Sequence, residues 1–169
     1  MAHFQHYFCL SLILLSLLCI HHTANCDDND EEECLLRGIN SFRTSLKLPI
    51  LTENDKAECL AEEIAEQLKN QPCTNNTDAN TLPGTEPQFP DFPNLLNRCK
   101  LNVTTTRDAV ILPACVPNLD QDVVLSNYTH SHYSGALNDT RYTGIGIGSD
   151  DNWIVVILTT NTSTGDFAR

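Results

Sequence analysis

Basic residues are scarce in this 169-residue chain. It holds 10 lysines and arginines against 22 aspartates and glutamates, which gives a formal net charge of −12. Nucleic acids and anionic lipid surfaces repel a chain of this charge, so neither is expected as a partner. No acidic or basic residue precedes Asp27. A chain that begins there therefore keeps the whole of this charge.

Several patterns that indicate a particular chemistry are also missing. The sequence has no C-x-x-C pair, which excludes the usual zinc sites, and no G-x-S-x-G elbow of a serine hydrolase. The glycines between Gly144 and Gly148 lack the spacing and the lysine of a phosphate loop. Beyond the N-terminal segment the only histidines are His130 and His132, and side chains two residues apart point in different directions. No metal and no other cofactor is expected.

The N-terminus carries an apolar stretch from Tyr7 to Ile20. Its length is typical of a secretory signal and is short for a span of the bilayer. Small residues at Ala24 and Cys26 predict cleavage before Asp27. A retained membrane anchor is the alternative, but no stop-transfer pattern follows and no transmembrane helix is expected in the mature chain. The expected organisation is a signal peptide (1–26), an acidic disordered segment (27–34), one domain (35–160) and a polar tail (161–169).

The cysteines and the glycosylation motifs agree with an extracellular protein. In an oxidising compartment two disulfides are expected, in any of three connectivities, among Cys59, Cys73, Cys99 and Cys115. Cys34 is then the odd cysteine, either free or paired with another chain. Five N-x-S/T motifs predict N-glycosylation at Asn75, Asn102, Asn127, Asn138 and Asn161.

The pattern of apolar residues indicates a mixed α and β domain. Helical periodicity predicts a helix over about 32–45 and a second one that ends near Lys69. Thr52-Glu53-Asn54-Asp55 supplies capping side chains for the second helix. Proline-rich composition predicts a long loop over 71–93, with its ends held by Cys73 and Cys99. The remaining expected elements are a short helix at 94–100, a strand at 110–112 that Pro113 stops, a helix capped by Asp120, and a short helix over 132–137.

The segment from Thr143 to Thr160, TGIGIGSDDNWIVVILTT, predicts an antiparallel hairpin. Its second strand is apolar on both faces, which indicates a position in the middle of a sheet. The alternating glycines of the first strand leave a bare strip against which another element can pack closely. Asp150 and Asp151 are interpreted as turn residues and not as calcium ligands.

Two long segments resemble the secreted CAP superfamily of cysteine-rich secretory proteins, antigen 5 and pathogenesis-related proteins. LLRGINSFRTSLKLPILTENDKAECLAEEIAEQL is similar to the opening helices of that superfamily, with Asn40 and Arg43 at its polar positions. HYSGALNDTRYTGIGIGSDDNWIVVIL is similar to its closing part. The resemblance implies an α+β fold, a CAP-like α-β-α sandwich around a small antiparallel sheet, here stabilised by disulfides.

The chain resembles more closely the plant family of uncharacterised GPI-anchored proteins with a CAP-like domain. The shared segments are LLRGINSFR, AECLAEEIAEQLKNQPCTN, PGTEP, TRDAVILPACVPNLD and TGIGIGSDDNWIVV. Membership implies an extracellular location, on the outer face of the plasma membrane if a GPI anchor is attached. A GPI signal ends in an apolar tail of about 10–20 residues, and none follows Asn161. The chain is therefore expected to be a truncated product or a soluble member of an anchored family.

The resemblance also bears on chemistry, because CAP domains place two histidines and two glutamates around a cleft that can hold a metal. His132 takes the position of one of these histidines, but residues 71–118 contain no histidine for the other. A metal-dependent role is therefore doubtful, and His132 remains only as a weak candidate for a cleft residue. The acidic residues of the second helix are interpreted as a solvated face, with a carboxylate site as the alternative; they are Glu58, Glu62, Glu63 and Glu66.

The expected function is that of a non-catalytic binding or signalling module in the plant extracellular space, an interpretation that disfavours an enzyme without excluding one. Its ligand is left open among lipids, sterols, wall fragments and proteins, as is its oligomeric state. One alternative is a sterol- or lipid-binding CAP domain. Another is an extracellular hydrolase in which His132 activates Ser131 or Ser134.

Overall fold

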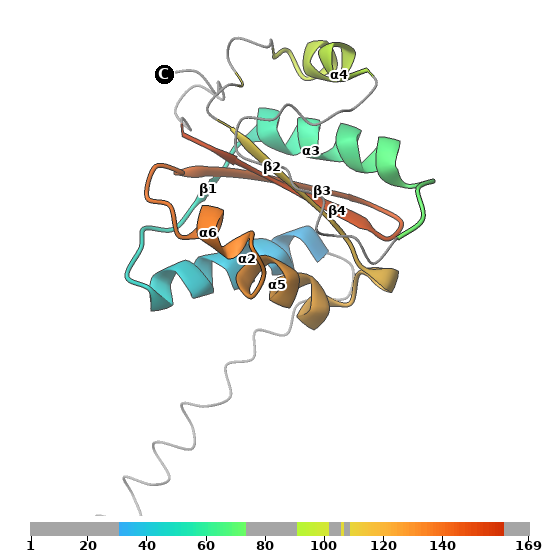
Figure 1. Cartoon of the computed structure of the whole chain (residues 1–169). Helices are drawn as coiled ribbons and strands as arrows, with labels where there is room; N and C mark the ends of the chain where they lie inside the picture. The colour runs from blue at the N-terminus through green and yellow to red at the C-terminus, as the bar shows by residue number, and fades with distance from the viewer. Residues whose placement is uncertain (1–30, 74–90, 102–105, 107–108, 161–169) are drawn as a thin grey trace, which may run out of the picture.

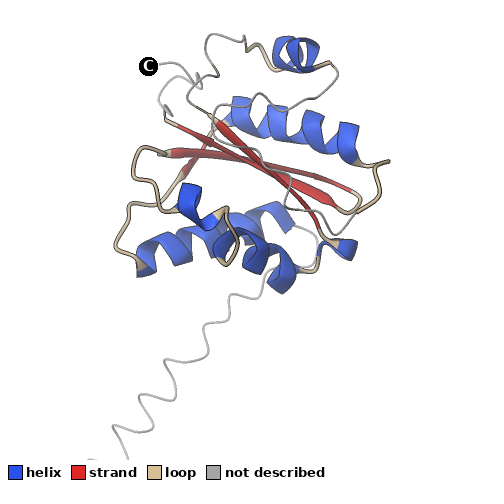
Figure 2. Cartoon of the chain, viewed as in Figure 1, coloured by secondary structure: helices blue, strands red, loops and turns tan. Residues whose placement is uncertain are grey.

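The computed structural model describes residues 31–73, 91–101, 106 and 109–160. In this part a sheet lies between two layers of helices (Figure 1). Helices α3 (Asp55–Leu68) and α4 (Phe92–Arg98) lie on one side, and α2 (Glu31–Ser45), α5 (Gln121–Thr129) and α6 (Ser134–Leu137) lie on the other. Figure 2 shows the same three layers by secondary structure. The predicted α-β-α sandwich is confirmed, whereas the signal peptide, the C-terminal tail and most of the long loop lie outside the described residues.

The sheet has four strands in the order β1-β3-β4-β2. Strands β3 (Gly144–Asp150) and β4 (Trp153–Thr159) form the predicted antiparallel hairpin, and β2 (Val110–Cys115) pairs antiparallel with the other side of β4. β4 therefore lies in the interior of the sheet, as its apolar faces predict. The hairpin turns at Asp151, which adopts a φ of 54°, while Asp150 pairs with Lys69 at 3.2 Å.

Two features of the sheet differ from the sequence prediction. β1 (Thr52–Glu53) adds a parallel strand beside β3, and a strand of two residues carries no periodicity by which to recognise it. β2 also continues through Pro113, which was expected to stop it. Because β2 is an edge strand, Pro113 can face away from β4, and its carbonyl accepts the Tyr133 hydroxyl at 2.6 Å.

Helix α3 packs on the glycine strip of β3. A Cβ atom at Gly146 would lie 2.1 Å from the backbone nitrogen of Glu58, and one at Gly148 would lie 2.2 Å from that of Glu62. Only glycine allows the helix backbone to approach the strand this closely. The close packing that the alternating glycines predict is therefore confirmed.

On the opposite face, α2 is held by two polar side chains of the opening signature. The Asn40 amide accepts the backbone N–H of Leu51 at 2.8 Å and donates to its carbonyl at 3.1 Å. Arg43 is fully buried and donates to four backbone carbonyls, those of Pro49, Leu137, Asp139 and Tyr142. Burial lowers the pKa of Arg43, and the negative charge of Asp139 opposes that shift. These residues join α2 to the segments that precede β1 and β3.

The side chains of the strands divide between two hydrophobic cores. Ile145, Ile147 and Ile154 pack with α2, α5 and α6, whereas Val155 and Ile157 pack with α3 and α4. This alternation follows from the period of two along a strand. In the described part of the chain, no helix is both long and apolar enough to cross a membrane.

The N-terminal boundary of the domain also differs from the expectation. Helix α2 begins at Glu31, so residues 31–34, expected to belong to a disordered acidic segment, form its first turn. Carboxylates are favourable at this position, because the N-terminus of a helix carries a partial positive charge. This first turn brings Glu32 and Glu33 against the body of the domain.

Candidate functional site

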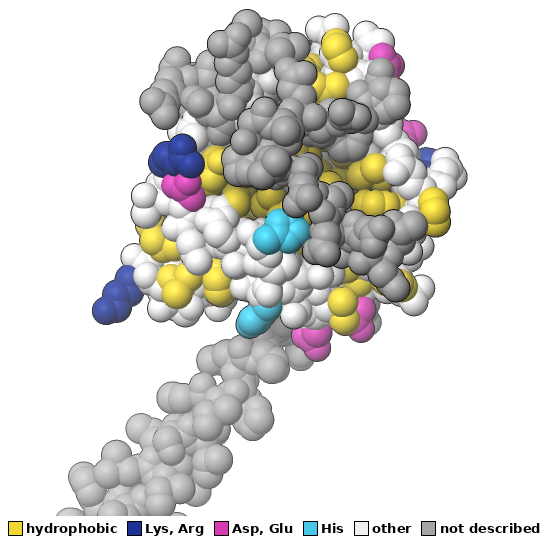
Figure 3. Space-filling model, viewed as in Figure 1, with side chains coloured by type: hydrophobic (Ala, Val, Ile, Leu, Met, Phe, Trp, Pro, Cys, Tyr) yellow, Lys and Arg dark blue, Asp and Glu magenta, His cyan; other side chains and the backbone are white. Residues whose placement is uncertain are grey.

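The two histidines do not form a joint site. His132 is exposed, and its ring contacts that of Tyr133 at a centroid distance of 4.3 Å. His130 is exposed at the end of α5, where its Nδ1 lies 2.8 Å from the Thr129 hydroxyl. Figure 3 shows the histidine side chains of this face as two separate patches. They do not converge on a common ligand.

The serines beside His132 are bound to the backbone. Ser131 Oγ accepts the backbone N–H of Tyr133 at 3.1 Å, and the Ser134 hydroxyl donates to the carbonyl of Ser131 at 2.7 Å. Within the described residues, neither hydroxyl is hydrogen-bonded to His132. The nucleophile and base that the hydrolase alternative needs are therefore not paired here.

The acidic face of α3 also lacks a metal-binding arrangement. Glu62 and Glu66 are exposed, and Glu63 pairs with Arg98 at 2.7 Å. Across the described ranges, no three His, Cys, Asp or Glu side chains form a group that could hold a metal ion.

The disulfides brace the layer that contains α3 and α4. Cys59 on α3 is bonded to Cys99 at the end of α4, and Cys73 is bonded to Cys115 at the end of β2. Cys34 is disulfide-bonded as well, so the expectation that it is the odd cysteine is wrong. Cys34 adjoins an acidic run in the sequence, but in the structure it is buried in the first turn of α2.

Two of the five glycosylation motifs fall on described residues. Asn138 is exposed at the end of α6, and Asn127 is half-buried on α5. The other three, Asn75, Asn102 and Asn161, lie outside the described residues.

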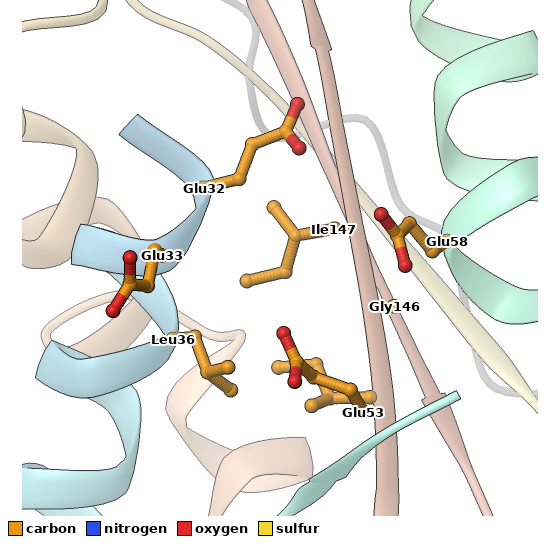
Figure 4. A pocket seen from close by; sticks show the side chains of 8 residues that line it. Glu32, Glu33, Leu36, Glu53, Glu58, Gly146 and Ile147 are labelled. Atoms are coloured by element: carbon orange, nitrogen blue, oxygen red, sulfur yellow. The ribbon is translucent and has the colours of Figure 1, made fainter. Parts of the chain in front are cut away.

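A hollow of about 240 Å³ opens beside β3, between the N-terminal turns of α2 and α3. We call it the acidic groove, because Glu32, Glu33, Glu53 and Glu58 line it together with Leu36 and Ile147. In Figure 4 Glu32 and Glu53 lie on the same side of the strand as Ile147, and Glu58 on α3 lies on the other side. These residues form one concave site of uniform charge.

The groove exists because β1 ends early. β1 pairs with β3 only as far as the register Glu53↔Ile145. The next residue, Asn54, caps α3 by accepting the N–H groups of Lys56 at 3.2 Å and Ala57 at 3.0 Å. The chain therefore leaves the sheet at Asn54. No other strand of the described part pairs with this edge of β3 beyond Ile145.

Two of the groove carboxylates already have partners. Glu32 accepts the Ser149 hydroxyl at 2.8 Å, which holds the first turn of α2 against β3. Glu33 lies 3.8 Å from the guanidinium of Arg37, one turn farther along α2. A shallower hollow continues from the groove along the outer face of α2 toward the exposed Ile50.

The negative charge of the groove affects the pKa of Glu58. Partial burial raises the pKa of its carboxyl, and the nearby carboxylates of Glu62, Glu32, Glu53 and Asp55 raise it further, in that order. A raised pKa in the folded state means that ionisation of Glu58 opposes folding. The protonated carboxyl of Glu58 therefore favours the folded state. Its contribution to stability is fully present below the ordinary pKa of glutamate and is lost as the pH rises through the raised pKa.

We expect Glu53→Gln to lower the pKa of Glu58 toward the ordinary value, because one of the nearby negative charges is removed. The measurement is a ¹³C NMR titration of the side-chain carboxyl. Glu58 is exposed, so the gain in stability at neutral pH should be no more than about 0.5 kcal/mol. Glu66→Gln is the matched control on α3 and should leave the titration of Glu58 unchanged. An unaltered Glu58 titration in Glu53→Gln would contradict this description of the groove.

The sequence does not reveal this groove. Its pattern places Glu32 and Glu33 in an acidic segment, Glu53 in a helix cap and Glu58 on a solvated helix face. The four residues come from three elements, and no spacing in the sequence brings them together. The feature that indicates the groove is the early end of β1. It can be recognised only from the pairing of β1 with β3 in the structure.

The comparisons with known proteins identify relatives of the whole domain. Residues 32–158 match the model of the family described as the Uncharacterized GPI-anchored protein At5g19230-like domain. A curated relative, the Uncharacterized GPI-anchored protein At3g06035 of Arabidopsis thaliana, is 56% identical over 159 residues. That match covers 94% of this chain and 79% of the relative.

Solved structures share the fold at low sequence identity. An extracellular SCP-domain protein from Bacillus anthracis superposes with a TM-score of 0.57 at 19% identity, and the match covers 77% of this chain but only 40% of that protein. An outer surface protein from Borrelia burgdorferi gives a TM-score of 0.53 at 24% identity, over 79% of this chain and 94% of its own. A cysteine-rich secretory protein from Staphylococcus aureus gives a TM-score of 0.52 at 15% identity, and the match covers 76% of this chain and 38% of that protein. They confirm the CAP-like fold.

Proposed function

Because the chain belongs to the At5g19230-like family of GPI-anchored proteins, a family of the outer plasma-membrane surface, we propose that it is a non-catalytic module that binds a cationic extracellular ligand in the acidic groove. The observation that carries this proposal is that Glu32, Glu53 and Glu58 line one concave site. Carboxylates on fixed elements attract a cation without further rearrangement.

The structure offers less support for the two alternatives. His132 is exposed and has no serine hydrogen-bonded to it in the described residues, which leaves a hydrolase without an activated nucleophile. A sterol or lipid site is mostly apolar and encloses most of its ligand. The acidic groove is lined by four carboxylates, so its lining favours a cation over a sterol.

The test is a binding measurement on the full chain with tetralysine as the probe and tetraglutamate as the negative control. We expect saturable tetralysine binding that weakens with salt and falls about tenfold in the double variant Glu53→Gln/Glu58→Gln, because each exposed charge contributes only modestly. The double variant Glu66→Gln/Asp122→Asn, with the same change of charge on exposed residues outside the groove, should bind nearly as well as the parent.

The same preparation is assayed for turnover of ester, peptide and glycoside substrates. No turnover is expected, and His132→Ala should not change tetralysine binding. Hydrolysis that His132→Ala abolishes would overturn the proposal in favour of the enzyme. Tetralysine binding that is equal in the two double variants would show that the groove is not the site.

A further inference from the structure

The edge of β3 that faces the acidic groove presents backbone groups that no described strand pairs. Thr52 N–H donates to the Thr143 carbonyl, and Asn54 N–H donates to the Ile145 carbonyl. Ile145 therefore faces β1. Because backbone groups alternate between the two sides of a strand, Ile147 and Ser149 present their N–H and C=O groups on this same side.

The other side of β3 is fully engaged. Gly146 and Gly148 lie opposite Ile157 and Val155 of β4 in an unbroken register that runs to the hairpin turn. The free hydrogen-bonding capacity of β3 is therefore directed into the groove. An exposed edge of this kind is a template for one more strand.

The space in front of this edge suits an extended segment. The groove of about 240 Å³ adjoins Gly146 and Ile147, in the row of the sheet that β1 leaves at Asn54. α2 borders the row on the face of Ile147, and α3 borders it on the face of the glycines. A chain in that row would continue the sheet.

The negative charge of the groove walls favours a positively charged chain as the added strand. A strand in this row turns alternate side chains toward the two helices, and both walls are acidic, with Glu32 and Glu53 on one side and Glu58 on the other. The chain's own segments outside the described residues provide no cation-rich occupant. Residues 1–30 and 74–90 contain neither lysine nor arginine, and the remaining segments hold only Arg107 and Arg169. The low cation content of these segments favours another molecule as the occupant.

We propose that the open edge of β3 binds an extended, lysine- or arginine-rich peptide segment as an added strand, paired with the backbone of Ile147 and Ser149 and held by Glu53 and Glu58. This inference rests on the proposed function and specifies its ligand. The backbone pairs fix the conformation of the peptide, and the carboxylates select its charge. The sheet then has five strands in place of four.

The test uses the full chain and the fluorescent peptide acetyl-Lys-Lys-Lys-Lys-Lys-Lys-amide, which presents lysines to both acidic walls. Its partner probe has the same sequence with every backbone nitrogen methylated, which keeps the charge but removes all strand donors. We expect the methylated peptide to bind at least about tenfold more weakly, because each lost hydrogen bond lowers affinity severalfold. Binding of the unmodified peptide should also slow hydrogen exchange at the amides of Ile147 and Ser149.

A pair of protein variants tests the same contact from the other side. Ser149→Pro removes the N–H group on the open edge of β3, and edge strands tolerate such a proline. Ser149→Ala keeps the N–H group and loses only the hydroxyl that donates to Glu32. Peptide binding should fall further in Ser149→Pro than in Ser149→Ala. If Ser149→Pro does not fold, the methylated peptide and the exchange measurement decide the question.

The outcomes separate the two proposals. Equal binding of both peptides, with loss of binding in Glu53→Gln/Glu58→Gln, would overturn the added strand and leave a cation-binding groove. Absence of binding by both peptides and by tetralysine would overturn the proposed function as well.

Discussion

Alanine in place of Gly146 should lower the free energy of unfolding by more than about 3 kcal/mol, the upper end of what overpacking usually costs. The added Cβ atom would lie 2.1 Å from the backbone nitrogen of Glu58 and 2.2 Å from the carbonyl carbon of Ala57. Both atoms belong to the backbone of α3, so no side-chain rotation relieves the overlap. The whole helix has to move away from the sheet, and the packing between them is lost.

Urea unfolding monitored by circular dichroism measures this effect. Gly135→Ala is the matched control, because nothing lies within 4 Å of a Cβ atom at that position in α6. It should leave stability unchanged or raise it by up to about 1 kcal/mol, since alanine favours a helix over glycine. Ala57→Gly should not rescue Gly146→Ala, because it removes a side chain and leaves the backbone contacts in place. Equal stability of Gly146→Ala and Gly135→Ala would refute the close approach of α3.

Replacement of Arg43 by methionine should lower the free energy of unfolding by about 3–5 kcal/mol, because each buried acceptor left without a donor costs about 1–3 kcal/mol and such losses do not add fully. The guanidinium is fully buried and donates to four carbonyls that come from the link after α2 and from the segment around α6 and β3. Methionine fills a similar volume but leaves these acceptors without donors. Arg43→Lys should also be destabilised, because one ammonium group cannot reach all four carbonyls.

Arg37→Met provides the comparison on the same helix. Arg37 is exposed and lies 3.8 Å from Glu33, so its loss should change stability by less than about 0.5 kcal/mol. Thermal unfolding of the three variants under one buffer condition measures the difference. A loss at Arg43→Met no larger than at Arg37→Met would contradict the structural role assigned to Arg43.

The sequence is most informative where one element carries its own signal. The apolar run of β4 predicts an interior strand, and the alternating glycines predict the close approach of α3, because both depend on residues adjacent in the chain. The polar pair Asn40 and Arg43 marks the opening helix by resemblance. The structure shows the role of Arg43, which the sequence does not. It donates to backbone carbonyls as far as 99 residues away in the sequence.

The candidate site cannot be predicted in the same way. β1 has two residues and therefore no period to detect, and its early end at Asn54 is what leaves the groove open. Pro113 suggests that β2 ends there, because proline interrupts an interior strand. β2 lies at the edge of the sheet, which the sequence does not show, and an edge strand can contain a proline. Cys34 adjoins the acidic run in the sequence, although it belongs to a helix.

The interior position of β4 has a consequence for biosynthesis. β4 is the last strand of the described sheet, yet it lies between β3 and β2 and touches both hydrophobic cores. In a nascent chain that has not yet exposed Trp153 to Thr159, β2 has no strand that joins it to β3. The sheet therefore depends on a contact that is distant in sequence from β2. The domain is therefore expected to complete its fold only after nearly all of it has left the ribosome, and until then its two helical layers depend on the secretory chaperones.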